Sequence, residues 1–464
     1  MIITKLAIKG LHGVYNYTIN FNDDLTLIYG ENGCGKTTIL DIASSIVTGK
    51  LYNLFSYKFD EISLAYRKSR RSKLNRINII TVGDAYDVTL NDGEMNETIK
   101  DIRNVKDIYA RDEDEVAFDR RFISTYEIPS YIRKTFKYIY LPLSRNSQDG
   151  IDINDANYYR RRKALMYAER DFVNKNYLND SLRYVEDIVR SGCMRISTAE
   201  NIINAKFRRN ILMSSLKVTS EYNANYFLFG PNVKKNALTD IEKSKDEYIR
   251  TLESIGEWNT DTSEQVEPFF AKYKKAYEQL QQGDDQSKNR ITIELLLMNS
   301  EFNKIKEIAS QAQQIEAEKA EARTSKTTFL NIVNDFLNIG EEKKNVSISN
   351  EGKIIIEVNN THRRLSLYDL SSGEKQIIII FACLTFGLPT EQSGIYIVDE
   401  PEASLHLSWQ KHFVESILKT KSTIQFIFAT HSPEIIGRYT DRAVKLVKTV
   451  ANTKMIEDES DEEC

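Results

Sequence analysis

The chain has 464 residues, a net charge of −4 and a hydrophobic content of 41%. This length exceeds the ~250–300 residues at which a single hydrophobic core stops growing, so we expect two or more lobes. The net charge excludes a generally polybasic nucleic-acid binder but leaves room for a local basic patch.

Nothing in the sequence indicates a membrane or a secretory route. The longest apolar stretch, residues 377–388, is 12 residues long, whereas a membrane-spanning helix needs ~20. The N-terminus MIITKLAIKG lacks the apolar segment of a signal peptide. The four cysteines show no CxxC spacing, which predicts neither a disulfide framework nor a zinc site. We expect a soluble, cytoplasmic protein that does not contact membranes.

The first fifty residues predict strands, a glycine-rich loop and a helix. MIITKLAIKG and YNYTINFN alternate apolar and polar residues, LTLIYG is an apolar run, and TTILDIASSIVTG has helical spacing. Residues 61–70 and 75–93 predict further strands, with turns at Gly83-Asp84 and Asp92-Gly93. We therefore expect an antiparallel sheet beside the first strand, within an N-terminal part that covers residues 1–153.

Residues 154–340 are mostly polar with helical stretches, and we interpret them as a helical insertion. The segment LFGPNVKK interrupts the helical pattern with Gly230 and Pro231. No glycine or proline lies between Gly283 and Gly340, which predicts a short helical arm. An apolar stripe with 4-3-4-3 spacing favours packing within the chain over a partner-binding zipper. Its members are Met298, Phe302, Ile305, Ala309 and Ala312.

From Val346 the apolar period returns to two, and the end of the chain predicts strands alternating with helices. VSISN and KIIIEVNN are predicted strands, YDLSSGEKQ is a capped helix start, and GIYIVDE and TIQFIFATH are strands separated by a helix. This order is typical of a parallel nucleotide-binding sheet. We assign residues 341–450 to it, and interpret residues 451–464 as a solvated acidic tail.

The strongest chemical signal is GENGCGKTT, which stands between a predicted strand and a predicted helix. It fits G-x-x-x-x-G-K-[ST], the phosphate-binding loop. In such a loop backbone N–H groups surround the β-phosphate, the lysine neutralises β/γ charge, and the threonine hydroxyl ligates Mg²⁺. The loop predicts ATP and Mg²⁺ as cofactors. The predicted contacts are Gly30, Asn32, Gly33, Gly35, Lys36, Thr37 and Thr38.

GIYIVDEPEASLH places two carboxylates directly after a buried strand. Asp399 and Glu400 would lie at the carboxyl end of a parallel sheet, where ligands bind. We predict that Asp399 holds Mg²⁺ and that Glu400 positions and polarises the attacking water. His431 follows the next apolar strand and is the predicted γ-phosphate contact.

In this order the motifs resemble those of the ABC-type ATPases. The LSGGQ signature of that superfamily is matched at residues 370–374, with Ser372 and Glu374 as departures, and the SSGE variant resembles the branch with SMC, RecF and OLD proteins. The resemblance implies an α/β fold with a P-loop ATPase head of mixed sheet and flanking antiparallel strands. It also implies that Ser371, Ser372, Gly373 and Glu374 cap the γ-phosphate held by a second copy of the chain.

The distances between motifs separate the branches of this superfamily. From Lys36 to Leu370 is 334 positions, about three times the separation in a transporter subunit, and a 56-residue helix spans only ~84 Å, too little for SMC-type tethering. YIYLPLSRNS resembles the segment that opens the glutamine loop of OLD-like proteins, which implies that Arg145 and Gln148 lie beside the γ-phosphate, with Gln148 on Mg²⁺. Too few residues follow His431 for a Toprim nuclease domain, so a nuclease would act in trans.

Two classes of function remain open. Length and layout resemble the AriA ATPases of PARIS anti-phage systems, which implies a homo-oligomer that holds a Toprim nuclease inactive until it senses a phage protein that mimics DNA. The ATPases of Septu and retron systems, which work with HNH nucleases, are a close alternative. The second class is a RecF-like DNA-binding ATPase of repair or replication. Its support is RKSRRSKLNR, residues 67–76, where six basic residues could neutralise phosphates or form a solvated hairpin tip.

Overall fold

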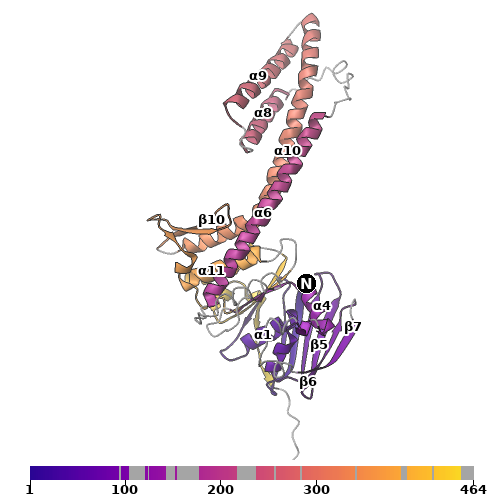
Figure 1. Cartoon of the computed structure of the whole chain (residues 1–464), viewed down its shortest axis with the longest axis vertical. Helices are drawn as coiled ribbons and strands as arrows, with labels where there is room; N and C mark the ends of the chain where they lie inside the picture. The colour runs from indigo at the N-terminus through magenta and orange to yellow at the C-terminus, as the bar shows by residue number, and fades with distance from the viewer. Residues whose placement is uncertain are drawn as a thin grey trace, which may run out of the picture. The chain divides into compact units, whose positions relative to one another are not determined.

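The computed structural model describes residues 1–93, 96–103, 121–123, 125–142, 152–153, 177–216, 237–254, 258–282, 285–339, 342–387, 394–420 and 423–450. The predicted acidic tail and LFGPNVKK lie outside these residues. The chain divides into two compact units (Figure 1): Met1–Cys193 together with Ser325–Cys464, and Met194–Thr324. Helices α6 (Tyr177–Leu216) and α10 (Asp285–Leu337) each contain a boundary between the units.

A six-stranded sheet forms the centre of the first unit. Neighbouring strands run parallel except at one edge, where β9 is antiparallel to β8. In order, the strands are β15 (Ala443–Lys445), β3 (Leu25–Tyr29), β14 (Ile424–Thr430), β13 (Gly394–Asp399), β8 (Tyr138–Pro142) and β9 (Asp152–Ile153). Every residue of β13 and β14 is buried, which explains their continuous apolar sequences.

A seven-stranded antiparallel sheet lies in the same unit. Its strands, in order, are β16 (Thr449–Val450), β2 (Tyr15–Asn20), β1 (Ile2–Leu11), β4 (Glu61–Arg67), β5 (Leu74–Val82), β6 (Ala85–Asn91) and β7 (Asn96–Arg103). The predicted Gly83-Asp84 turn joins β5 to β6, because Val82 pairs with Ala85. The two sheets are tied by Gln425, whose buried side chain bonds both the N–H and the carbonyl of Ile3 at 2.8 and 2.7 Å.

Helices cover both faces of the parallel sheet because successive residues of a strand point to opposite sides. Ile397 and Ile427 belong to the core shared with α1 (Lys36–Val47), η1 (Leu51–Ser56), α4 (Glu127–Thr135) and the antiparallel sheet. On the other face, Tyr396 donates to the Ile380 carbonyl of α11 (Ser372–Phe386), at 2.8 Å. Phe428 packs against Phe413 of α12 (Leu407–Leu418). The short segments α13 (Pro433–Ile436) and η3 (Thr440–Arg442) follow β14.

The C-terminal end of α10 packs against a third, smaller sheet of the first unit. Its antiparallel strands are β10 (Lys344–Ile348), β11 (Ile354–Val358) and β12 (Arg364–Leu365), followed by η2 (Leu367–Asp369). Asn334 of α10 bonds the N–H and carbonyl of Val346, at 2.6 and 2.9 Å. Phe336 packs against Phe381 of α11. These contacts fix β10 beside the start of α11.

The second unit is helical. α8 (Ala237–Ser254) and α9 (Thr260–Gln282) lie beside α10 (Figure 1). The three helices share a hydrophobic core. Phe302 stacks on Tyr273 of α9 with ring centroids 4.7 Å apart, and Met298 joins the same core. Ala312 packs with Phe207 of α6. The apolar stripe therefore packs within the chain, as predicted.

The predicted α/β class, with a mixed sheet, flanking antiparallel strands and a helical arm, is confirmed. Among the described residues, no helix combines the length and the apolar character that crossing a membrane requires.

Candidate functional site

The glycine-rich loop connects the end of β3 to the start of α1. Gly33 and Gly35 have φ angles of 73° and 99°, a region that L residues disfavour. The Tyr17 hydroxyl donates to the Cys34 carbonyl at 3.1 Å. A Cβ at Gly35 would lie 3.1 Å from the same hydroxyl. Glycine at 35 therefore serves both the backbone angle and the close approach of Tyr17.

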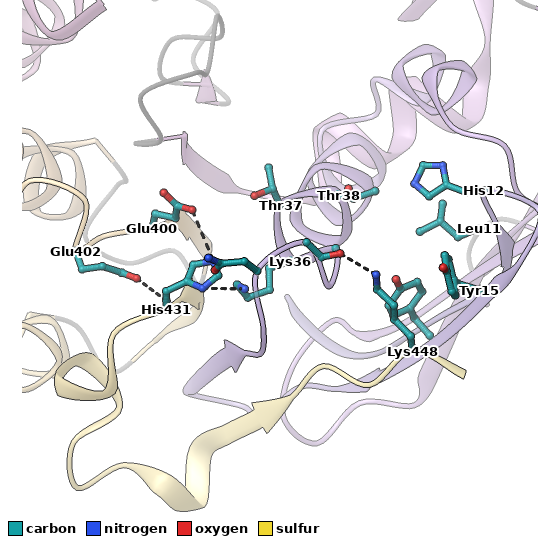
Figure 2. Close-up of a pocket in the computed structure, with 14 residues that line it drawn as sticks. Leu11, His12, Tyr15, Lys36, Thr37, Thr38, Glu400, Glu402, His431 and Lys448 are labelled. Atoms are coloured by element: carbon teal, nitrogen blue, oxygen red, sulfur yellow. Dashed lines mark hydrogen bonds and ion pairs between the residues drawn. The ribbon is translucent and has the colours of Figure 1, made fainter. Parts of the chain in front are cut away.

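Lys36 begins α1 and joins the loop to the end of β14. Its ammonium donates to the carbonyls of Gly30 and Glu31 at 3.0 and 3.1 Å. It also lies 3.3 Å from Nδ1 of His431 (Figure 2). Because an ammonium can only donate, Nδ1 accepts, and the proton of the neutral imidazole is then on Nε2. That nitrogen is 3.8 Å from a carboxylate oxygen of Glu400.

Glu400 has an unusual backbone conformation. Its φ angle of 51° lies in the left-handed region, where a non-glycine residue carries strain of ~1–3 kcal/mol. The conformation is held by a hydrogen bond from its N–H to the Ala429 carbonyl, at 2.9 Å. The side chain is 35% exposed and lines the pocket. The turn after β13 thus presents this carboxylate to a ligand.

Asp399 is the last residue of β13 and is almost fully buried. Neither of its carboxylate oxygens has a hydrogen-bond partner of ordinary geometry. Burial raises the pKa of Asp399 to about 6; the Thr37 side chain acts in the opposite direction, and the Glu400 charge adds to the increase. A buried carboxylate without a partner beside a threonine hydroxyl suits a hard cation with oxygen ligands. The donor set therefore fits Mg²⁺ held by Thr37 and Asp399.

Lys36, Thr37, Glu400 and His431 meet at a pocket of about 700 Å³, and Asp399 lies buried beside it. Lys448, just before β16, donates to the Gly33 carbonyl at 2.8 Å and lies over the ring of Tyr15. Tyr15 and Lys448 thus form one wall of the pocket. No motif in the sequence predicted this wall, because Tyr15 follows the β1–β2 turn and Lys448 lies more than 400 positions later in the chain. The lining residues are Leu11, His12, Tyr15, Tyr17, Asn32, Gly33, Gly35, Lys36, Thr37, Thr38, Glu400, Glu402, His431 and Lys448.

Glu402 is a pocket residue that the sequence analysis missed. One of its carboxylate oxygens accepts the backbone N–H groups of His431 and Ser432, at 2.5 and 3.2 Å (Figure 2). Glu402 therefore links the loop after β13 to the loop after β14 and determines where His431 stands. The sequence offered one signal for it: Glu402 is the third carboxylate within four residues, after Asp399 and Glu400.

The signature segment starts α11. Ser371 caps this helix in a capping box: its hydroxyl accepts the Glu374 N–H, and Glu374 accepts the Ser371 N–H. Ser371 and Ser372 are exposed, whereas Gly373 is buried, and a Cβ there would lie 2.5 Å from the Ser404 carbonyl. None of these residues is among those lining the pocket of the same chain. The predicted Arg145 and Gln148 lie outside the described residues.

Comparison with known families agrees with this geometry. The family model described as AAA ATPase domain matches residues 1–436. The chain belongs to this family. It therefore has the nucleotide-binding fold of an ATPase domain.

Three curated relatives of this AAA ATPase come from bacteria. It is 34% identical over 104 residues to a probable ATPase of retron Ec83 from Escherichia coli, covering 20% of this chain and 19% of the relative. It is 30% identical over 111 residues to a probable ATPase of retron Vc95 from Vibrio cholerae serotype O1 biovar El Tor, covering 22% of each. A 41-residue match, 49% identical, covers 9% of this chain and 10% of the Septu protein PtuA from Bacillus thuringiensis. The matches thus span about a fifth or less of each relative.

Among solved structures, the AAA ATPase is similar to SMC heads. The Smc head domain with an extended coiled coil from Pyrococcus furiosus, bound to the C-terminal domain of ScpA, gives a TM-score of 0.42 at 14% identity. This match covers 97% of the present chain and 96% of that one. The SMC head domain from Thermotoga maritima gives 0.37 at 11% identity, with 98% and 100% covered. These values describe a likeness of fold only.

Proposed function

We propose that this AAA ATPase is the ATPase subunit of an anti-phage defence system, in which ATP joins two copies of the chain and controls a separate nuclease. The observation that carries the proposal is the position of the signature. Ser371 and Ser372 are exposed and lie outside the pocket of their own chain, which holds Lys36, Glu400 and His431. A nucleotide bound there would be completed by a second copy.

Within one chain, the pocket residues have separate roles. The loop N–H groups and Lys36 bind the phosphates, where Lys36 compensates their negative charge. The Glu400 carboxylate accepts the proton of the attacking water, and the Nε2–H of His431 faces the same region. When bound, Mg²⁺ neutralises charge on the β- and γ-phosphates. Thr37 and Asp399 would hold it.

The second copy would contribute the start of α11. The N–H groups of Ser372 and Gly373 lie in the first helical turn, where no helical carbonyl can reach them. Such a helix start favours an anion, and the Ser371 hydroxyl adds a polar group at the surface. This end of α11 is suited to the γ-phosphate of a nucleotide held by the other copy. ATP would then act as the link between the copies.

The partner of the assembly is the second part of the proposal. The named relatives belong to retron and Septu systems of bacteria, which supports a defence role. We expect that role to be cytoplasmic. The nuclease would be a separate chain, of the HNH class implied by a retron or Septu resemblance or the Toprim class implied by a PARIS resemblance. A phage protein would trigger its release. Purification of the tagged ATPase with its neighbouring gene product identifies the class by sequence. Absence of any nuclease from the complex and from the neighbouring genes would contradict the defence assignment.

The composite site is tested by mixing two inactive variants. Lys36→Ala removes phosphate binding, and Ser371→Arg blocks the signature while leaving the loop of the same chain intact. Mixed assemblies contain interfaces with an intact loop opposite an intact signature, so part of the wild-type ATPase activity should return. If hydrolysis stays at background at all mixing ratios, with subunit exchange shown independently, the nucleotide site is self-contained and the proposal fails.

A DNA-binding function is supported by one specific feature. The turn between β4 and β5 is held by hydrogen bonds between Ser69 and Ser72, at 2.9 and 3.0 Å. It presents Arg71 and Lys73 as exposed residues, and Arg76 is exposed on the adjoining strand β5. Three exposed cations on this turn and the start of β5 could contact a phosphate backbone.

The test of DNA binding is the salt dependence of duplex affinity. If the turn binds DNA, replacing Arg71, Lys73 and Arg76 by Gln should lower affinity and reduce the slope of log K against log salt by roughly two to three. The same change at Lys243, Lys272 and Lys275 in the helical unit is the control. Equal slopes in wild type and triple variant would exclude this turn as a DNA contact.

A further inference from the structure

Glu374 links the signature to a neighbouring strand. One of its carboxylate oxygens accepts the Ser371 N–H at 2.8 Å, and the other accepts the ammonium of Lys344 at 2.7 Å. The residue is buried. A single carboxylate thus closes the capping box of α11 and forms an ion pair with β10.

Lys344 is buried where it meets this carboxylate. Both side chains of the pair are only 11% exposed, and a second carboxylate, that of Glu342, lies 3.3 Å away at the surface. β10 is in turn fixed to α10 by the two hydrogen bonds between Asn334 and Val346. The backbone that carries Lys344 is therefore held in place beside α10.

The charges of the pair support each other. Burial raises the pKa of Glu374, but the hydrogen bonds from Lys344 and Ser371 outweigh it, so the net pKa lies below the ordinary value. Burial lowers the pKa of Lys344, but its bonds to Glu374 and Glu342 bring the net pKa above the ordinary value. Both groups are charged at neutral pH, and a charge-assisted bond holds the Ser371 N–H.

We infer that Lys344 is a positioning residue of the ATPase, which acts through Glu374 to set the first turn of α11 where it meets the γ-phosphate. The inference rests on the proposed composite site. Since the Ser371 N–H is held by Glu374, the N–H groups of Ser372 and Gly373 keep one direction. Gly373 is packed closely against the Ser404 carbonyl, so a shift of the helix start cannot be absorbed locally.

The first test is a double-mutant cycle. Lys344→Met should lower kcat roughly ten- to hundredfold, because a misplaced contact costs turnover. KM for ATP should change by less than about threefold, since the binding loop is intact. Glu374→Gln keeps an acceptor for Ser371 without a charge, so adding Lys344→Met to it should change kcat by less than about threefold. Equal losses in both backgrounds would overturn the inference.

The matched control is Lys353→Met. Lys353 lies between β10 and β11, and its ion pair with Glu351 is exposed, so kcat should equal that of wild type. Melting temperatures report whether each variant folds. If Lys344→Met alone does not fold, the comparison of Glu374→Gln with the double variant decides. A double variant with much lower kcat than Glu374→Gln would show that Lys344 does not act through the Glu374 charge.

A mixing experiment distinguishes the role of Lys344 from the existence of the composite site. Lys344→Met chains have an intact loop and a disturbed signature, so mixing them with Lys36→Ala chains should restore activity, as Ser371→Arg chains do. Rescue by Ser371→Arg chains without rescue by Lys344→Met chains overturns only the role of Lys344. Absence of rescue with both overturns the composite site as well.

The pH profile of kcat provides a further readout. Its acid limb should move to higher pH in Lys344→Met, because Glu374 loses the hydrogen bond that lowers its pKa.

Discussion

The ammonium of Lys36 lies 3.3 Å from Nδ1 of His431, although 395 positions separate the two residues. The contact exists because β3 and β14 are parallel neighbours, so the loops that follow them leave the sheet at the same edge. It makes Lys36, the proposed phosphate-binding lysine, the donor that selects the tautomer of the histidine. A change at Lys36 should therefore alter the position of the imidazole proton as well as the proposed phosphate contact.

Lys36→Ala should reduce ATP hydrolysis to background and weaken ATP binding. The substitution removes the positive charge from the phosphate site and the donor to His431. Steady-state phosphate release and fluorescent-ATP titration measure the two effects. Lys411→Ala, on the exposed side of α12, is the control and should behave as wild type. Wild-type turnover by Lys36→Ala would mean that the pocket is not the hydrolytic site.

Glu400→Gln should bind ATP with nearly unchanged affinity and hydrolyse it about 10²–10⁴ times more slowly. The amide keeps the size of the side chain but cannot accept a proton from water. An ATP-bound assembly should then accumulate, visible as a larger species by size-exclusion chromatography with light scattering. If phosphate release continues at the wild-type rate, the proton goes to a different group.

Glu402→Ala should lower turnover by roughly tenfold or more, because two backbone N–H groups lose their acceptor and His431 is no longer held. Glu402→Gln retains one acceptor oxygen and should keep most of the activity. The comparison of kcat between these two variants isolates the positioning effect. Equal activity of the alanine variant and wild type would show that the loop after β14 is held by other contacts.

Asp399→Asn should stabilise the chain while it abolishes hydrolysis. The folded pKa of about 6 lies above the ordinary 3.8, so the stability linked to this carboxyl is present below pH 3.8 and lost as pH rises through about 6. Above pH 6, without Mg²⁺ or nucleotide, the variant should gain ~2–3 kcal/mol in free energy of unfolding. Near pH 4 the gain should vanish. Denaturant titration at both pH values measures it, with the exposed Asp441→Asn as control. A variant that is less stable than wild type at pH 7.5 would contradict the buried-charge explanation.

Local sequence was enough to predict the features that depend on adjacent residues. The phosphate-binding loop needs glycines at fixed spacing beside a lysine, and that pattern is visible without any fold. The strands β13 and β14 were visible as continuous apolar runs, because a strand buried on both faces needs them. The capped start of α11 was likewise predictable, since a capping box is a contact between residues three positions apart.

Contacts between distant segments were decided by the tertiary structure alone. Three contacts of the pocket join loops that meet only when the strands are in register. They are the contact of His431 with Lys36, the hydrogen bonds of Glu402 to the loop after β14, and the contact of Tyr15 with Lys448. The ion pair of Lys344 with Glu374 depends on β10 lying beside α11. The spacing of these two residues in the sequence does not predict this ion pair. Hydrogen bonds between residues a few positions apart, and the pattern of buried and exposed residues along a strand, depend on neighbouring residues and can be read from the sequence. The approach of two side chains across a sheet edge depends instead on the packing of the whole core.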